Sequence, residues 1–215
     1  MITGAPGAPA RHGARLGTRE ILVGGMRVAV ATAIPAPGAA LSVAARRLAE
    51  ALVADCIGAA ARGVRVASLL PSGRPVASGP EGLLALSVSL SHERGLVAAA
   101  VADGTSVGID VVDGSAVRPG LEHWLEESER ASDASPGMLW AAKEAAYKAA
   151  GIDAPFRPRA VAVEADGEGF SWRLTDRWRE VCGAGRFLAD GRHLLAVACV
   201  SVRPGPGIEG GAPCS

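Results

Sequence analysis

The sequence lacks net charge. Lysine and arginine total 22, aspartate and glutamate total 22, and the formal net charge at pH 7 is +0. A protein without a positive field has no general attraction to nucleic acid or to an anionic membrane surface. The charge balance therefore argues against nucleic acid and membranes as partners.

Long apolar runs and cysteine motifs are missing as well. Glycine, proline, arginine or aspartate interrupts every hydrophobic stretch before it reaches about 18 residues, the length that a membrane-spanning helix requires. The first residues hold no continuous apolar segment, so we expect no signal peptide, no membrane anchor and a cytoplasmic protein. The four scattered cysteines form no CxxC pair, and we expect them to be reduced.

The sequence does contain enough apolar material to fold. Hydrophobic residues make up 49% of the 215 residues and charged residues 20%, which excludes global disorder. Glycine, proline and alanine crowd both ends, so we expect disordered tails at 1–18 and 203–215. Between them, the pattern of strand, helix and several strands occurs twice. We therefore divide the chain into an N-terminal half, 19–105, and a C-terminal half, 106–202.

Two long helices are marked by their expected ends. The first has Ser42 as its predicted N-cap and Gly58 as its predicted C′ residue. The second has Ser135 as N-cap, Pro136 at the first helical position and Gly151 at its end.

Alternating apolar residues predict the strands. They are expected at 26–33, 64–70, 86–91, 96–102, 106–112, 160–164, 170–174 and 192–202. Segregated antiparallel strands with one long helix in each half indicate an α+β protein rather than a doubly wound parallel sheet.

An acidic residue inside an apolar strand is the first candidate for chemistry. Asp110 lies in VGIDVV, where an ionised carboxylate is costly unless it is paired or binds a metal. Alternatively, Asp110 ends the strand and caps the turn at Asp113-Gly114. The sequence alone does not favour either interpretation.

The second candidate is the helical segment WAAKEAAYKA at 140–149. Its predicted buried face consists of Ala142, Ala146 and Ala149. Four polar residues are expected to project together elsewhere: Lys143, Glu144, Tyr147 and Lys148. Glu144 and Lys148 also fit a simple solvent-exposed pair one helical turn apart.

Two further segments are weak signals when each is taken alone. SLSH, 89–92, places a histidine at a strand end, where most histidines are ordinary surface residues. PSGRP, 71–75, is an ordinary turn whose Gly-Arg pair could approach a phosphate or a purine.

In this order, GRP, SLSH, VGIDVV and WAAKEAAYKA resemble the motifs of the 4′-phosphopantetheinyl transferase superfamily. Members show a Gly-Lys/Arg-Pro turn, an S-x-S-H strand end, a G-I/V-D strand and a W-x-x-K-E-x-x-x-K helix. The match runs from about residue 44 to residue 202, and the length fits the Sfp-like, pseudo-dimeric class. This class implies two similar α+β halves, each an antiparallel sheet packed on a long helix, related by pseudo-twofold symmetry.

The resemblance implies transfer of the 4′-phosphopantetheine arm from coenzyme A to a serine of an apo acyl or peptidyl carrier protein. Adenosine 3′,5′-bisphosphate is released, and Mg²⁺ is required. A monomer is expected, because the second half supplies what a neighbouring subunit supplies in the half-length class.

Residue by residue, the resemblance implies that Asp110 and Glu144 are catalytic and bind Mg²⁺, and that Glu144 helps to deprotonate the carrier serine. Lys148 matches the catalytic lysine. The implied coenzyme A contacts are Arg47 (or its neighbour Arg46), Gly73, Arg74, Pro75, Ser91, His92 and Lys143.

Two departures from the family pattern stand out. Val112 stands where Sfp-like members often have a second acidic residue, and Asp113 is expected on the opposite strand face. The segment before the first helix lacks the family's basic residues, for which only Arg11, Arg15 or Arg19 could compensate. The rival hypothesis is therefore a non-catalytic homologue that binds coenzyme A or a carrier protein.

A short helix is also predicted for LEHWLEESERA, from Leu121 onward. Trp124 in this segment is a possible contact for the carrier protein. The favoured interpretation is an amphipathic helix that packs Trp124 on the core.

Overall fold

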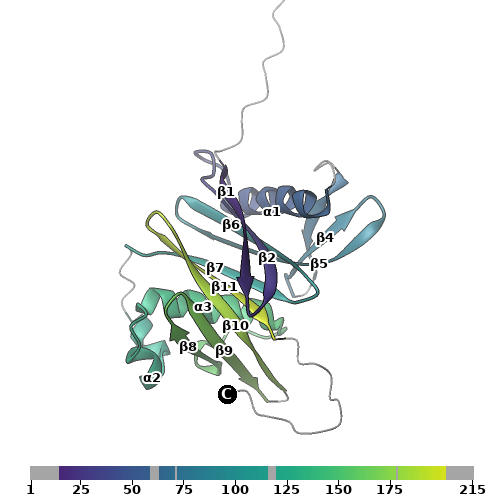
Figure 1. Ribbon diagram of the computed structural model, residues 1–215. Helices are drawn as coiled ribbons and strands as arrows, with labels where there is room; N and C mark the ends of the chain where they lie inside the picture. Colours follow the sequence, from purple (N-terminus) through teal and green to yellow (C-terminus); the bar gives the residue numbers. More distant parts are fainter. Residues whose placement is uncertain (1–14, 59–62, 71, 116–119, 178, 202–215) are drawn as a thin grey trace, which may run out of the picture.

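The computed structural model describes residues 15–58, 63–70, 72–115, 120–177 and 179–201. Two antiparallel sheets and a few helices form a mixed α+β fold, which confirms the predicted class (Figure 1). The expected tails lie largely outside the described residues. Strand β1, Arg15–Val23, begins inside the expected N-terminal tail, so the prediction of disorder up to residue 18 is wrong.

The first sheet has six strands in the spatial order β1-β2-β6-β5-β4-β3. Helix α1, Leu41–Ile57, lies between β2 and β3 in the chain. It ends at Gly58 with a φ of 63°, as predicted, but Ala40 rather than Ser42 takes the N-cap position. The other strands are β2 Met26–Ala33, β3 Arg65–Ser68, β4 Pro75–Gly79, β5 Gly82–Glu93 and β6 Leu96–Asp103.

The second sheet has five strands in the order β7-β11-β10-β9-β8. Helix α3, Pro136–Ala150, has both predicted ends: the Ser135 hydroxyl accepts from Met138 N at 3.3 Å, and Gly151 has a φ of 61°. The strands are β7 Val107–Asp113, β8 Val161–Asp166, β9 Gly169–Asp176, β10 Arg179–Asp190 and β11 His193–Val200.

The two sheets repeat one topology. Leaving out β1, each half runs strand, long helix and four strands, and the fifth strand pairs between the first and the fourth. The spatial orders β2-β6-β5-β4-β3 and β7-β11-β10-β9-β8 therefore match position by position. The division expected between residues 105 and 106 falls in the connection between β6 and β7.

Three apolar clusters account for the packing. One joins α1 to the first sheet and includes Leu52 and Val101, and a second joins α3 to the second sheet and includes Leu139. The third lies between the sheets and includes Val30 and Ile109. Alternate residues of a strand face opposite sides, so β6 and β7 each supply side chains to two of these clusters.

The segment after β7 differs from its prediction. It forms a 3-10 turn, η2 Leu121–Trp124, and one helical turn, α2 Glu127–Arg130. Leu125 is the buried hydrophobic residue of this segment, whereas Trp124 is 48% exposed, so the favoured packing of Trp124 on the core is wrong. A further 3-10 turn, η3 Pro158–Ala160, precedes β8.

The cysteines only partly follow expectation. Cys56 and Cys199 carry free thiols, whereas Cys182 is disulfide-bonded, so the prediction of four reduced cysteines is wrong.

No helix in the described part of the chain is both long and apolar enough to cross a membrane.

Candidate active site

A cleft of about 1040 Å³ is lined by both halves of the chain. The N-terminal half contributes the turn between β3 and β4 and residues 84–90 of β5, and the C-terminal half contributes the end of α3 and the loop that follows it. This volume lies at the upper end of the range for small-molecule sites. Four residues expected at the site line it: Gly73, Arg74, Pro75 and Lys148.

The turn between β3 and β4 is closed by backbone hydrogen bonds and docks on the opposite half. Gly73 N donates to Leu69 O at 2.6 Å, and Gly73 has a φ of 72°, which favours glycine. The Arg74 guanidinium donates to Gly151 O at 3.4 Å. A side chain at Gly151 would collide with that guanidinium, so glycine there leaves room for the contact.

Glycine also sets the distance between α3 and β7. A Cβ atom at Gly108 would overlap the carbonyl oxygen of Ala145, so the helix lies directly on the strand backbone. Ala142 and Ala146 are fully buried at this contact. Because the helix lies this close, Lys148, three residues after Ala145 on α3, reaches Asp110, two residues after Gly108 on β7.

Lys148, Asp110 and Glu144 meet beside the cleft. Lys148 Nζ lies 2.7 Å from Asp110 Oδ1 and 4.0 Å from Glu144 Oε2, and it donates to Ile109 O at 3.0 Å. Only 7% of the Asp110 side chain is exposed, against 31% and 30% for Lys148 and Glu144. The pair on α3 is thus tied to a buried carboxylate and is not a simple solvent-exposed ion pair.

Asp110 lies within β7, not at its end, so the turn-capping interpretation is wrong. Asp113 has that role, since Ser115 N and Ser115 Oγ donate to Asp113 Oδ1 at 3.0 and 2.6 Å. Arg192 Nε lies 3.4 Å from the other oxygen of Asp113. Val112, on the same strand face as Asp110, is buried in the cluster with α3 and offers no ligand atom.

Neutral donors hold one oxygen of each carboxylate in the pair. Ser91 Oγ donates to Asp110 Oδ1 at 2.8 Å, and Trp140 Nε1 donates to Glu144 Oε1 at 2.7 Å. The Trp140 ring packs edge-on against Phe156, with centroids 5.6 Å apart. The sequence motif includes Trp140 but predicts no role for it, although its position one helical turn before Glu144 indicates this contact.

The site carries surplus negative charge. Burial and the nearby Asp110 carboxylate raise the pKa of Glu144 to about 7, although Lys148 and the Trp140 hydrogen bond act in the opposite direction. Two carboxylates share one ammonium, which leaves one excess negative charge in a partly buried position when both are ionised.

These residues fit a divalent cation that is completed by its substrate. Mg²⁺ is commonly held by one or two carboxylates together with substrate phosphates and water, and Asp110 and Glu144 supply two carboxylates next to a large cleft. Among the described residues, no group of three or more His, Cys, Asp or Glu side chains could hold a metal ion. Asp110 and Glu144 would supply two ligands, and substrate phosphate oxygens and water would supply others.

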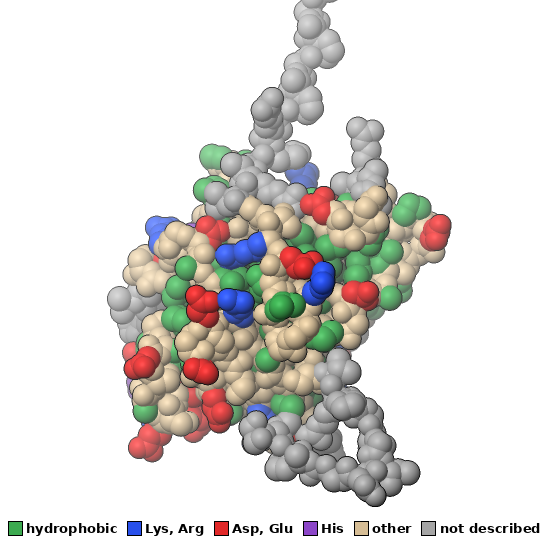
Figure 2. Space-filling model, in the orientation of Figure 1, with side chains coloured by type: hydrophobic (Ala, Val, Ile, Leu, Met, Phe, Trp, Pro, Cys, Tyr) green, Lys and Arg blue, Asp and Glu red, His purple; other side chains and the backbone are tan. Residues whose placement is uncertain are grey.

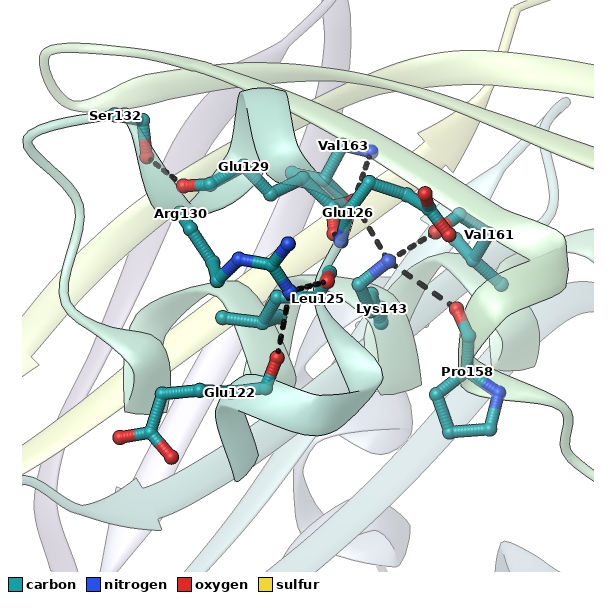
Figure 3. A network of polar contacts seen from close by, with 10 residues as sticks. All are labelled: Glu122, Leu125, Glu126, Glu129, Arg130, Ser132, Lys143, Pro158, Val161 and Val163. Atoms are coloured by element: carbon teal, nitrogen blue, oxygen red, sulfur yellow. Dashed lines mark hydrogen bonds and ion pairs between the residues drawn. The ribbon is translucent and has the colours of Figure 1, made fainter. Parts of the chain in front are cut away.

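Lys143 does not join this site. It is fully buried, with Nζ 2.6 Å from Glu129 Oε1 and bonded to the carbonyl oxygens of Pro158 and Val161 (Figure 3). An ammonium has three donors, so an incoming ligand finds none free. The expectation that Lys143 projects with Glu144 and Lys148 is wrong.

Three other expected contacts for coenzyme A lie apart from the cleft. Arg47 is on the exposed face of α1, and His92 is exposed at the end of β5. Ser91 is buried against Asp110. None of these three is among the described residues that line the cleft.

The surface charge agrees with the balanced composition. Figure 2 shows acidic and basic side chains interspersed over one face, with no broad basic area.

No family model matches the chain. No curated protein matches it either.

Proposed function

We propose that the chain is a Mg²⁺-dependent 4′-phosphopantetheinyl transferase that modifies a serine of an apo acyl or peptidyl carrier protein in the cytoplasm. The observation that carries the proposal is the meeting of Asp110 and Glu144 with Lys148, which lines the cleft together with the Gly73-Arg74-Pro75 turn. These are the same residues that the family motifs single out, and they come from distant parts of the sequence.

The repeated topology supports the same proposal. The matching strand orders of the two sheets fit a pseudo-twofold relation between the halves, with α1 and α3 as equivalent helices. The cleft draws its walls from both halves, as a pseudo-dimeric enzyme requires. One chain then provides a complete site, and the active form is a monomer.

In the proposed reaction, the carrier serine oxygen forms a bond to the β-phosphorus of coenzyme A. The bridging P–O bond breaks, and its electron pair leaves with adenosine 3′,5′-bisphosphate. Glu144 accepts the serine proton. Lys148 stabilises the negative charge on the phosphoryl oxygens. When bound, Mg²⁺ neutralises the pyrophosphate oxygens, held by Asp110 and Glu144.

The cleft suits the nucleotide end of coenzyme A. Its walls combine apolar side chains such as Leu86 and Ile152 with the charged Arg74 and Lys148. Apolar walls with a few placed polar groups are typical of nucleotide-sized ligands. The exposed Trp124 remains a candidate contact for the carrier protein.

The second candidate function is binding of coenzyme A or a carrier protein without turnover. The apolar Val112 favours it, because this buried side chain replaces a possible third ligand. The 2.7 Å contact of Lys148 with Asp110 favours it as well, because the ammonium already neutralises one carboxylate.

Intact-mass spectrometry tests the proposal. An apo carrier protein incubated with the protein, coenzyme A and Mg²⁺ should gain the mass of one phosphopantetheine, and EDTA should prevent the gain. Asp110→Ala should abolish transfer. Asp113→Ala is the matched control on the same strand, because Asp113 bonds Ser115 and lies outside the site. Binding of coenzyme A without transfer to several unrelated carriers would establish the second candidate.

A further inference from the structure

Three serines on β5 accept hydrogen bonds from backbone N–H groups at the free edge of β7. β7 is the edge strand of the second sheet, so its outward N–H groups have no strand partner within that sheet. The serine hydroxyl oxygens accept hydrogen bonds from these groups at 3.0, 3.0 and 3.2 Å. The pairs, which we call the serine ladder, are Ser87 with Val107 N, Ser89 with Ile109 N and Ser91 with Val111 N.

Ser91 differs from the other two serines because it also contacts a carboxylate. Its hydroxyl donates to Asp110 Oδ1 at 2.8 Å while it accepts from Val111 N. A hydroxyl has one proton, so the backbone bond occupies a lone pair and leaves the proton directed at Asp110. Ser91 is 8% exposed, and its hydrogen bond in the serine ladder fixes the direction of its side chain.

Ser91 and Lys148 both donate to the same oxygen of Asp110. Oδ1 accepts from both Ser91 and Lys148, at 2.8 and 2.7 Å. Groups that hydrogen-bond a metal ligand set its orientation, and their loss commonly weakens metal binding.

We propose that Ser91 is a positioning residue: it fixes the orientation of the Asp110 carboxylate, which would serve as a ligand for a divalent cation. This inference rests on the proposed function, because it concerns the cation of that site. It gives Ser91 the role of orienting the metal ligand Asp110, whereas the family resemblance implies that Ser91 contacts coenzyme A.

The proposal makes the cation site depend on contact between the two halves. Ser91 belongs to β5 of the first sheet and Asp110 to β7 of the second, and the serine ladder joins these strands. One of the two groups that orient the Asp110 carboxylate, Ser91, therefore belongs to the other half of the chain, whereas Lys148 belongs to the same half.

The test measures metal and coenzyme A binding separately by isothermal titration calorimetry. Ser91→Ala should raise the Kd for Mn²⁺ about 10- to 100-fold. The Kd for coenzyme A, measured with EDTA, should stay within about twofold of wild type, as for a residue that does not touch the ligand. Ser89→Ala is the matched control, because it removes the same kind of backbone bond without touching Asp110. Its Mn²⁺ affinity should remain close to that of wild type.

Three results would overturn the proposal. The first is weaker coenzyme A binding with unchanged Mn²⁺ affinity in Ser91→Ala, which would show that Ser91 contacts coenzyme A instead of orienting Asp110. The second is an equal loss of Mn²⁺ affinity in Ser89→Ala, which would reduce the effect to lost strand contact. The third is no Mn²⁺ binding by wild type, with or without coenzyme A, which would remove the cation from the proposed function too. Ser91→Thr keeps the hydroxyl and should retain Mn²⁺ binding, which guards against a folding defect in the alanine variant.

Discussion

The indole Nε1 of Trp140 donates a 2.7 Å hydrogen bond to Oε1 of Glu144, one helical turn further along α3. The indole N–H, the only polar group of the tryptophan side chain, donates to the carboxylate, while the ring packs against Phe156. Glu144 therefore presents its other oxygen toward Lys148 and Asp110. The spacing of tryptophan and glutamate in the motif thus has a direct structural reason.

Trp140→Phe should lower the kcat of phosphopantetheine transfer about 10- to 100-fold, the usual effect of losing a hydrogen bond to a charged group. The phenyl ring preserves most of the packing, so the melting temperature should change little. Steady-state kinetics with a carrier protein give the measurement. An unchanged kcat would show that Glu144 needs no such orientation.

Gly108→Ala should destabilise the protein by about 1 to 3 kcal/mol or more, because the new methyl group overlaps the Ala145 carbonyl oxygen. α3 must then move away from β7, and the distance between Lys148 and Asp110 increases. Chemical denaturation and Mn²⁺ binding should both report the change. Gly137→Ala is the control within α3, where the nearest atom to an added Cβ is Val112 Cγ2 at 3.8 Å. A Gly108→Ala variant as stable as that control would contradict the close packing.

Local signals were sufficient to predict α3 and most of the strands. Ser135, Pro136 and Gly151 mark the ends of α3 by capping chemistry that needs no tertiary contact. The prediction from Ser42 is wrong at α1 because the N-cap is Ala40, two residues earlier, and it provides no side-chain cap. A serine near a helix start is a preference and does not fix the first residue.

Three strands were missed because tertiary contacts create them. β10 contains Gly183 and Gly185, which are poor strand formers. Rings of Trp172 and Phe170 lie over these glycines, and an added Cβ would collide with them. β1 and β4 likewise lie in segments rich in turn residues or charge, and their pairing with β2 and β5 depends on the sheet.

The predicted grouping of the polar residues of α3 is wrong for Lys143. Glu129, its partner, lies in a one-turn helix 14 positions away, where no periodic pattern links the two. The prediction of Asp110 as a paired carboxylate succeeded because burying a lone charge is costly in any fold.

Lys143→Met should lower the free energy of unfolding by about 3 to 5 kcal/mol, because it leaves the Glu129 carboxylate buried without its cation. The double variant Lys143→Met with Glu129→Gln should recover much of this loss. Urea denaturation of both single variants and the double variant supplies the cycle. Strictly additive losses would show that the two side chains do not interact.

Arg74→Ala should raise the Kd for coenzyme A about 10-fold or more, because Arg74 is a charged donor in the cleft wall. Arg47→Ala should leave this Kd near the wild-type value, since Arg47 is on the exposed face of α1 outside the cleft lining. Calorimetry with coenzyme A in EDTA compares the two variants. A larger effect at Arg47 would mean that the nucleotide extends toward α1.

The raised pKa of Glu144 makes stability depend on pH in a defined direction. In the folded protein this pKa is about 7, against 4.5 as the ordinary value, so the folded state binds the proton more tightly than the unfolded state. The resulting stabilisation is complete below pH 4.5 and is lost as pH rises through 7.

Glu144→Gln cannot ionise and should not lose this stabilisation. Relative to that variant, wild type should therefore lose about 2 to 3 kcal/mol between these limits, measured by urea denaturation at a series of pH values. Saturating Mg²⁺ should reduce the loss, since a bound cation favours the ionised carboxylate. A difference between the two proteins that stays constant with pH would show that Glu144 titrates normally.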